Sequence, residues 1–293
     1  MSANKPAQLF IVLAAFLWGF MGLASRPLFD AGFSYFQMVA SRSVITSVCL
    51  FAFLLLTDTS KAKVKVKHIP LFICLGCGLS INSMCYMNTI EMITLSAAAI
   101  LLYTAPYMVM LMSAVFFKER ITPQKVCALL IAFTGCVMTV GVIDSAKIST
   151  PGIISGLTAA FFYALYTILS KYALRSYHPY TVTAYTFGVA GAVLIPICGV
   201  REMAALICAS RNTLAHVLLL GFFITLFPFV FYQKGLEKIE PSRASIIAFF
   251  EPLTSSLLGA LVFKEMLTPV RILGMALIFL SLIILNTRKA GQA

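Results

Sequence analysis

Charged side chains are scarce in this chain. They make up 11% of its 293 residues, whereas hydrophobic residues make up 60%. So few charges cannot cover the surface of a soluble domain, which excludes that class and predicts an integral membrane protein. Acidic residues are rarer still, with 10 Asp and Glu against 22 Lys and Arg. The basic residues stand in short connectors rather than on one periodic face, so we attribute them to membrane topology and expect no nucleic-acid partner.

Long polar stretches are also lacking. The longest, "DTSKAKVKVKH" at 58–68, is read as a charged loop, and apolar runs near 20 residues fill most of the chain. Such runs match helices that cross a bilayer, because barrel strands would alternate over about ten residues. We predict an all-α membrane protein with ten transmembrane helices at 8–28, 36–57, 69–90, 94–117, 124–143, 151–173, 180–200, 213–233, 242–263 and 269–287.

Reactive groups are few. The three histidines lie at predicted span ends, and most of the eight cysteines lie inside apolar runs, where they behave as small hydrophobic residues. No nucleophile elbow, zinc-binding HExxH or phosphate-binding loop occurs in the sequence. We therefore expect no enzyme activity, no catalytic residue, no metal site and no cofactor.

Basic residues are distributed unequally between alternate connectors. Of the 22 Lys and Arg, fifteen fall in the connectors on the side of the N-terminus, six on the opposite side, and Arg42 inside a span. The positive-inside rule then predicts a protein of the inner membrane with both termini on the cytoplasmic side.

The second half of the chain repeats the first at an offset of 146 residues. We therefore predict two duplicated domains, 1–146 and 147–293. Because each holds five spans, an odd number, the second enters the membrane from the opposite side, and the pair forms an inverted repeat. Identities at this offset include Tyr86 with Tyr232, Ser96 with Ser242, Pro106 with Pro252, Lys118 with Lys264, Glu119 with Glu265, Thr122 with Thr268 and Pro123 with Pro269.

The phrase "KE..TP" occurs once in each half, between two spans. Thr122 and Thr268 suit the N-cap of the helix that follows, and the prolines after them suit its first position, where no N–H is needed. Glu119 opposes the macrodipole of the helix it follows, so we expect it to lean on a basic neighbour or on the next helix's N-terminus.

Ionisable groups at membrane depth are the best functional candidates, because hydrocarbon makes an exposed charge costly. Glu251 falls near the middle of span nine, directly before Pro252. The proline is expected to kink the helix and free the Ala248 carbonyl, and Pro106 is expected to make the matching kink in span four. A structural salt bridge or a shallower position for Glu251 is the alternative.

Arg42 and Asn82 are the other polar candidates inside spans. Arg42 is open to three interpretations: a counter-charge for Glu251, a binding group for an anionic part of a solute, or a side chain that extends to the external surface. Asn82 either hydrogen-bonds a solute or joins two helices.

Aromatic residues at symmetry-related or polar positions complete the candidate binding site. An aromatic wall beside one acid suits a cationic or amphipathic organic solute, through stacking and cation–π contact. Packing against helices or lipid is the alternative for each of these residues. They are Trp18, Tyr86, Tyr103, Tyr163, Tyr166 and Phe249.

The chain resembles the drug/metabolite transporter superfamily, specifically its EamA-like ten-span carriers, over nearly its whole length. The resemblance rests on the order and spacing of "FLWG" around Trp18, "FFYALYTILSKY" at 161–172, "YMNTIEMITLSAAAILLYTAP" at 86–106, "YQKGLEKIEPSRASIIAFFEP" at 232–252 and the two "KE..TP" phrases. By position, Trp18, Tyr86, Tyr103 and Tyr163 resemble the cavity-wall residues of that family, and Glu251 its acid before proline. The chain departs from the pattern at Ala105, where the first half lacks the acid, and at Tyr163, which stands in place of Trp.

The resemblance implies a secondary carrier with a central cavity and alternating access. The expected partners are the lipid bilayer and a small organic metabolite, with an amino acid or related amine favoured. Glu251 would neutralise a cationic group of the solute or carry a coupling proton. A channel or structural membrane protein is the alternative, and an intramembrane enzyme a weaker one; the oligomeric state stays open between monomer and homodimer.

Overall fold

The computed structural model describes residues 4–141, 149–264 and 266–287. Within those ranges the chain is a bundle of helices without strands, and ten of its helical segments are long and apolar enough to cross a membrane. Their bounds agree with the predicted spans to within a few residues at nearly every end, so the predicted fold class is confirmed. Glu265 and the predicted boundary at 146/147 lie outside the described residues.

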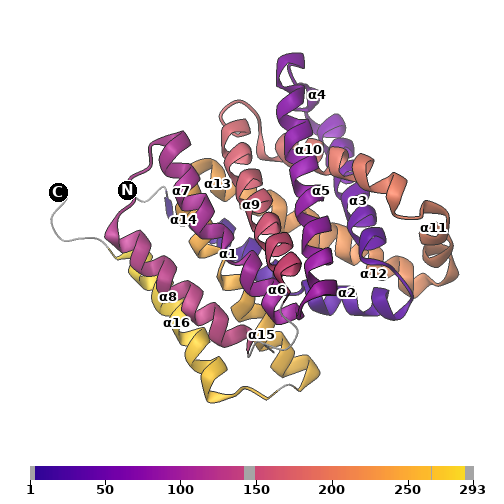
Figure 1. The fold of residues 1–293 in the computed structure, drawn as a ribbon. Helices are drawn as coiled ribbons and strands as arrows, with labels where there is room; N and C mark the ends of the chain where they lie inside the picture. Colours follow the sequence, from indigo (N-terminus) through magenta and orange to yellow (C-terminus); the bar gives the residue numbers. More distant parts are fainter. Residues whose placement is uncertain (1–3, 142–148, 265, 288–293) are drawn as a thin grey trace.

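The first half contributes spans one to five (Figure 1). Span one is built from two helices and span four from two more, whereas spans two, three and five each have one main helix. The helices are α1 Asn4–Trp18, α2 Met21–Asp30, α3 Tyr35–Thr57, α4 Thr59–Ala62, α5 Ile69–Met92, α6 Leu95–Leu102, α7 Ala105–Phe117 and α8 Pro123–Val140.

The second half contributes spans six to ten, of which spans eight and nine are interrupted. Its helices are α9 Thr150–Ala173, α10 Pro179–Leu194, α11 Val200–Ala209, α12 Arg211–Gly221, the π-helical turn Phe222–Leu226, α13 Phe227–Lys238, α14 Pro241–Ile247, α15 Phe250–Phe263 and α16 Pro269–Asn286. Two short elements were not predicted: α4 within the charged loop, and α11 before span eight.

Spans one, four, eight and nine are interrupted part-way through their length. Span one is interrupted at Gly19, and span eight passes through the π-helical turn. Span four is interrupted at Tyr103 and span nine at Ala248, so the two prolines lie in the first turn of the half-helices that follow. Interrupted helices are tolerated in a membrane where their free backbone groups are buried in protein or line a cavity.

The two "KE..TP" joints have similar backbone conformations at the lysine, threonine and proline that the structure describes in both. Lys118 and Lys264 each end a helix in the left-handed region, with φ of 55° and 56°. After each of them, a threonine Oγ1 accepts the backbone N–H three residues on at 3.3 Å, and proline takes the first helical position. The predicted caps are confirmed, which indicates that the repeat seen in the sequence is a repeat of structure.

Spans five and ten, α8 and α16, lie side by side on one flank of the bundle (Figure 1). Gly135 and Gly274 allow this approach, because a Cβ at either position would lie 2.6 Å from the carbonyl oxygen of the other. Small residues at such crossings are a common means of packing helices in membranes. The pair stands beside the remaining spans, which enclose the central part of the molecule.

Candidate functional site

A cavity of about 220 Å³ lies in the middle of the bundle. It begins at residues half-way along their spans and reaches the end of α2 near Phe29 and the start of α3 at Tyr35. This is the face opposite the one that holds the first and last described parts of the chain, at Lys5 and Thr287. We call the latter the chain-end face. The cavity is lined by Trp18, Met21, Ser25, Phe29, Tyr35, Met38, Val39, Arg42, Leu79, Asn82, Ser83, Tyr86, Leu102, Tyr163, Leu220, Phe229 and Glu251.

Glu251 lies in the first turn of α15, immediately after the interruption of span nine. An acid there suits the positive end of the half-helix dipole. Its half-buried carboxylate faces the cavity and makes no side-chain hydrogen bond or ion pair with any residue that the structure describes. One expectation is wrong: the Ala248 carbonyl is not free, because it accepts the Glu251 backbone N–H at 3.0 Å.

Arg42 enters the same cavity from the second turn of α3. Its Nη1 lies 3.8 Å from the Met21 sulfur, and its buried Nε has no hydrogen-bond partner among the described residues. No ion pair joins it to Glu251 anywhere in the described ranges. The structure therefore places two opposite charges in one cavity without pairing them.

The predicted aromatic residues fall into two groups. Trp18, Tyr86 and Tyr163 line the cavity. Tyr103 and Phe249 lie behind its wall, at the two interruptions, with ring centroids 5.9 Å apart. Tyr166 and Phe249 are almost fully buried and do not line the cavity in this conformation, so their role in binding a solute stays a prediction.

Asn82 lines the cavity and also joins helices. Its Nδ2 donates to the Ala159 carbonyl oxygen at 2.8 Å, which links α5 to α9. The side-chain oxygen, in contrast, accepts no hydrogen bond from the residues that the structure describes. The two roles considered for this residue are therefore compatible.

Sequence reasoning missed one face of α3 and several apolar residues. Tyr35, Met38 and Arg42 lie three and four residues apart on that helix, and all three line the cavity. The spacing is that of a single helical face, so extending the face from Arg42 would have found the other two. Phe229 and Leu220 had no comparable signal, because their exposure to the cavity depends on the rotation of each half of span eight.

An aromatic layer closes the cavity toward the chain-end face. We define it as Trp18, Tyr166, Phe229 and Tyr232. The Trp18 ring lies 5.1 Å from that of Phe229 and 5.4 Å from that of Tyr232, between centroids. Aromatic pairs at such distances are favourable contacts as well as a barrier to water.

Buried polar groups lie next to this layer. Gln233 Nε2 donates to the Tyr166 hydroxyl at 2.8 Å and to Ser170 Oγ at 3.0 Å, while Gln233 Oε1 has no partner among the described atoms. Nearby, Lys171 Nζ donates to the carbonyl oxygens of Leu236 and Ile239 at 2.7 and 2.8 Å. A lysine at these carbonyls caps the C-terminus of α13 and ties it to α9.

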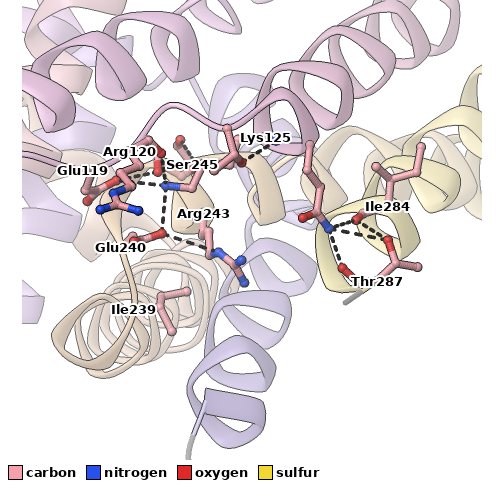
Figure 2. Close-up of polar contacts among 12 residues, drawn as sticks. Glu119, Arg120, Lys125, Ile239, Glu240, Arg243, Ser245, Ile284 and Thr287 are labelled. Carbon is pink, nitrogen blue, oxygen red and sulfur yellow. Dashed lines mark hydrogen bonds and ion pairs between the residues drawn. The ribbon is translucent and has the colours of Figure 1, made fainter. Parts of the chain in front are cut away.

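A network of charges joins the two halves at the chain-end face (Figure 2). Lys125 Nζ lies 2.8 Å from Glu240 and 3.6 Å from Glu119, and Arg243 Nε lies 3.5 Å from Glu240. Lys125 is the basic neighbour that was expected for Glu119, and the Ser242 hydroxyl also donates to this carboxylate. We call these five residues the chain-end network; a basin of about 1350 Å³, lined largely by Lys and Arg, opens beside it.

The profile of the EamA-like transporter family matches this chain twice, over residues 5–141 and 150–287. The chain belongs to the EamA-like transporter family. Each match covers five spans, so the repeat seen in the sequence corresponds to two copies of the family's own unit.

Named relatives are transporters. An uncharacterized transporter of Archaeoglobus fulgidus is 28% identical over 86% of this chain and 88% of its own length. The uncharacterized transporter YwfM of Bacillus subtilis is 25% identical over 97% and 95%. The pseudopaline exporter CntI of Pseudomonas aeruginosa is 24% identical over 98% of both chains.

A solved crystal structure has the same fold. It superposes with a TM-score of 0.79 over 97% of this chain and 98% of its own, at 18% identity. The family match, together with the ten candidate spans, identifies this EamA-like protein as a multi-pass membrane transporter.

Proposed function

We propose that this EamA-like protein is a secondary carrier that moves a small organic metabolite with a cationic amine across the cytoplasmic membrane by alternating access. The observation that carries the proposal is Glu251, an unpaired carboxylate facing a cavity in the middle of the bundle. An ionisable group at that depth is costly, so a functional counter-ion is the usual reason for one.

The chain-end face is taken as cytoplasmic. The basin on that face is lined by Lys5, Lys118, Arg120, Lys125, Lys171, Arg175, Lys238 and Arg243, against Glu119 and Glu240. This excess of basic residues follows the positive-inside rule. The conformation is then one in which the cavity faces outward and the cytoplasmic side is closed by the aromatic layer and the chain-end network.

In alternating access, the cavity would close on the outer side and open toward the cytoplasm. Opening toward the cytoplasm requires Lys125 to separate from Glu240, which lies in the other half, and Trp18 to separate from Phe229. The interruptions in spans one, four, eight and nine supply places where each half-helix can tilt without breaking a regular hydrogen-bond ladder.

Counterflow in proteoliposomes tests the proposal. Purified protein is loaded with unlabelled amines and amino acids and scored for exchange of labelled solute, beside the variant Glu251→Gln. Saturable exchange by the native protein that falls to background in the variant supports the carrier. Non-saturable flux would indicate a channel, a chemically altered product an enzyme, and unchanged exchange by the variant would remove Glu251 from the mechanism.

A pH gradient separates the two roles open to Glu251. If the carboxylate carries a coupling proton, a gradient drives uphill transport in the native protein and not in Glu251→Gln. If it only neutralises the solute's amine, exchange is indifferent to the gradient. Both readings predict loss of exchange in the variant, so the gradient experiment decides between them.

A further inference from the structure

The basin beside the chain-end network is strongly basic. Of the described residues that line it, eight are Lys or Arg and two are acids, Glu119 and Glu240. Each half of the chain supplies four of the basic residues: Lys5, Lys118, Arg120 and Lys125 from the first, and Lys171, Arg175, Lys238 and Arg243 from the second. The positive-inside rule accounts for basic residues on this face, but it does not require both halves to place them around one basin.

The two acids already have partners. Glu240 lies 2.8 Å from Lys125 Nζ and 3.5 Å from Arg243 Nε. Glu119 lies 3.6 Å from Lys125 Nζ and accepts the Ser242 hydroxyl. The acids therefore offset the charges of Lys125 and Arg243 and leave the other basic residues of the basin uncompensated by them.

Four of those other residues have no acid within ion-pair distance in the described ranges of the chain, and all four are exposed. They are Lys5, Lys118, Arg120 and Arg175. Arg120 lies directly beside the chain-end network (Figure 2). Lys171 and Lys238 differ from these four, because Lys171 donates to backbone carbonyls and Lys238 pairs with Glu237 at 3.2 Å.

Arg175 is held at the basin by aromatic rings. Its guanidinium carbon lies 5.0 Å from the centre of the Phe117 ring, which belongs to the first half, and 5.8 Å from that of Tyr172. Contact through the face of a guanidinium leaves the N–H groups at its edge able to bind an anion. Arg120 follows Phe117 by three residues, so the two halves each present an arginine to the same basin.

We propose that the basin binds an anion carrying two or more phosphate groups, which bridges the two halves and holds the chain-end face closed. Arginine suits this ligand because it offers two parallel N–H donors to a phosphate. At about 1350 Å³ the basin is larger than the pockets that small ligands usually fill, about 300–1,000 Å³, so an anion with several charged groups suits it better than a single ion.

Closure of the chain-end face gives the anion its effect. When the halves meet, their basic residues surround one basin, and repulsion between these like charges opposes the closure. An anion between them removes this repulsion and loses half of its contacts when the halves separate. It therefore binds the closed conformation more tightly and shifts the equilibrium toward it. This site lies outside the transport cavity and does not depend on which solute the carrier moves.

Thermal unfolding of the full chain in detergent tests the site. Pyrophosphate should raise the unfolding midpoint in a saturable way, whereas potassium chloride at the same ionic strength should not, because ionic screening has no binding site to fill. Cardiolipin in mixed micelles, compared with phosphatidylcholine, is the second arm. A saturable rise with pyrophosphate alone identifies a soluble ligand, and a rise with cardiolipin alone identifies a lipid headgroup.

Variants locate the binding. Arg120→Gln combined with Arg175→Gln removes one arginine from each half and should weaken the apparent affinity at least about tenfold. Arg120→Lys combined with Arg175→Lys keeps both charges and should lose less, which guards against a variant that fails to fold. Lys63→Gln combined with Lys65→Gln is the matched control, because these exposed lysines do not line the basin, and it should bind like the native protein.

Trp18 tests the conformational effect, since it belongs to the aromatic layer that closes the same face. The anion that stabilises the native protein should reduce quenching of the Trp18 emission by acrylamide. In Arg120→Gln with Arg175→Gln, the same concentration should leave the quenching unchanged.

Two results would overturn the inference. If neither pyrophosphate nor cardiolipin raises the midpoint beyond its control, or if the double glutamine variant binds as tightly as the native protein, the basin is not the binding site. If an anion binds there and Trp18 quenching stays the same, the anion does not hold the face closed. Counterflow measures solute transport separately, so either result leaves the proposed function standing.

Discussion

The two "KE..TP" joints share a backbone and differ in what their side chains reach. Both have a left-handed lysine, a threonine cap and a proline. At the first joint, Lys125 extends to Glu240 at the start of α14. The residue equivalent to Glu240 in the first half is Thr94, and the residue equivalent to Arg243 is Ala97.

Equivalent positions in the two halves therefore make different contacts. Thr94 caps its own helix by accepting the Ala97 backbone N–H at 3.2 Å, whereas Glu240 makes no side-chain cap and forms ion pairs with Lys125 and Arg243. The duplication preserved the backbone, because caps and left-handed turns are local. Because two side chains diverged, the chain-end face has a charge network. The sequence of the opposite joint does not contain the same set of residue types.

The largest effect is expected from Lys125→Ala, which breaks the network at its centre. The substitution leaves the Glu119 carboxylate, whose side chain is 8% exposed, without its cation. Removing one partner of a buried pair typically costs about 3 kcal/mol or more, so the midpoint of thermal unfolding in detergent should fall clearly. Lys63→Ala, at an exposed loop lysine, should leave the midpoint unchanged, and an equal loss in both variants would contradict the comparison.

A double variant, Glu240→Thr with Arg243→Ala, makes the chain-end face resemble the opposite one. Because Glu240 and Arg243 are partly exposed, the expected loss of stability is about 1–2 kcal/mol. The main effect should be conformational, since weaker closure favours opening toward the chain-end face.

Trp18 reports on that opening, because it is the only tryptophan in the chain and belongs to the aromatic layer. Its emission should shift to longer wavelength and become more accessible to acrylamide in the double variant. The single variant Lys238→Ala, which changes a basic residue of the basin outside the network, is the control. Identical quenching in both proteins would show that the network does not hold the layer closed.

The smallest effects on stability are expected from substitutions at the two threonine N-caps. Thr122→Ala and Thr268→Ala each remove one cap hydrogen bond of 3.3 Å, and each should cost about 1 kcal/mol. Equal losses in chemical denaturation are expected, since the two backbones match. A loss twice as large at one joint would mean that the joints are not equivalent units, and Thr→Ser at either site should restore most of the stability.

Much of the fold could be predicted because its determinants are local. Span length follows from bilayer thickness, and the caps at Thr122 and Thr268 follow from residue type. The interruptions near Pro106 and Pro252 were expected from the missing N–H of proline. The redirected Ala248 carbonyl was not, because a tight turn can satisfy a carbonyl that a regular helix would leave free.

The candidate site was predictable only where a residue was unusual. Glu251 and Arg42 stood out because charges are rare inside spans, and both line the cavity. Tyr103, Tyr166 and Phe249 were equally plausible in sequence, yet they lie behind the wall or in the aromatic layer. Which way an aromatic ring faces depends on the rotation of its half-helix, and no periodicity survives across an interruption.

By itself, the sequence determined the ten spans, the duplication, the joints and the two unusual charges, since each depends on length, residue type or spacing along the chain. Tertiary packing was needed to show that Arg42 and Glu251 share a cavity without pairing, that Tyr35 and Met38 line it too, and that Lys125 bridges to Glu240. Arg42 and Glu251, like Lys125 and Glu240, are more than a hundred positions apart in the chain. These relations depend on how the halves pack against each other, which local propensities do not specify.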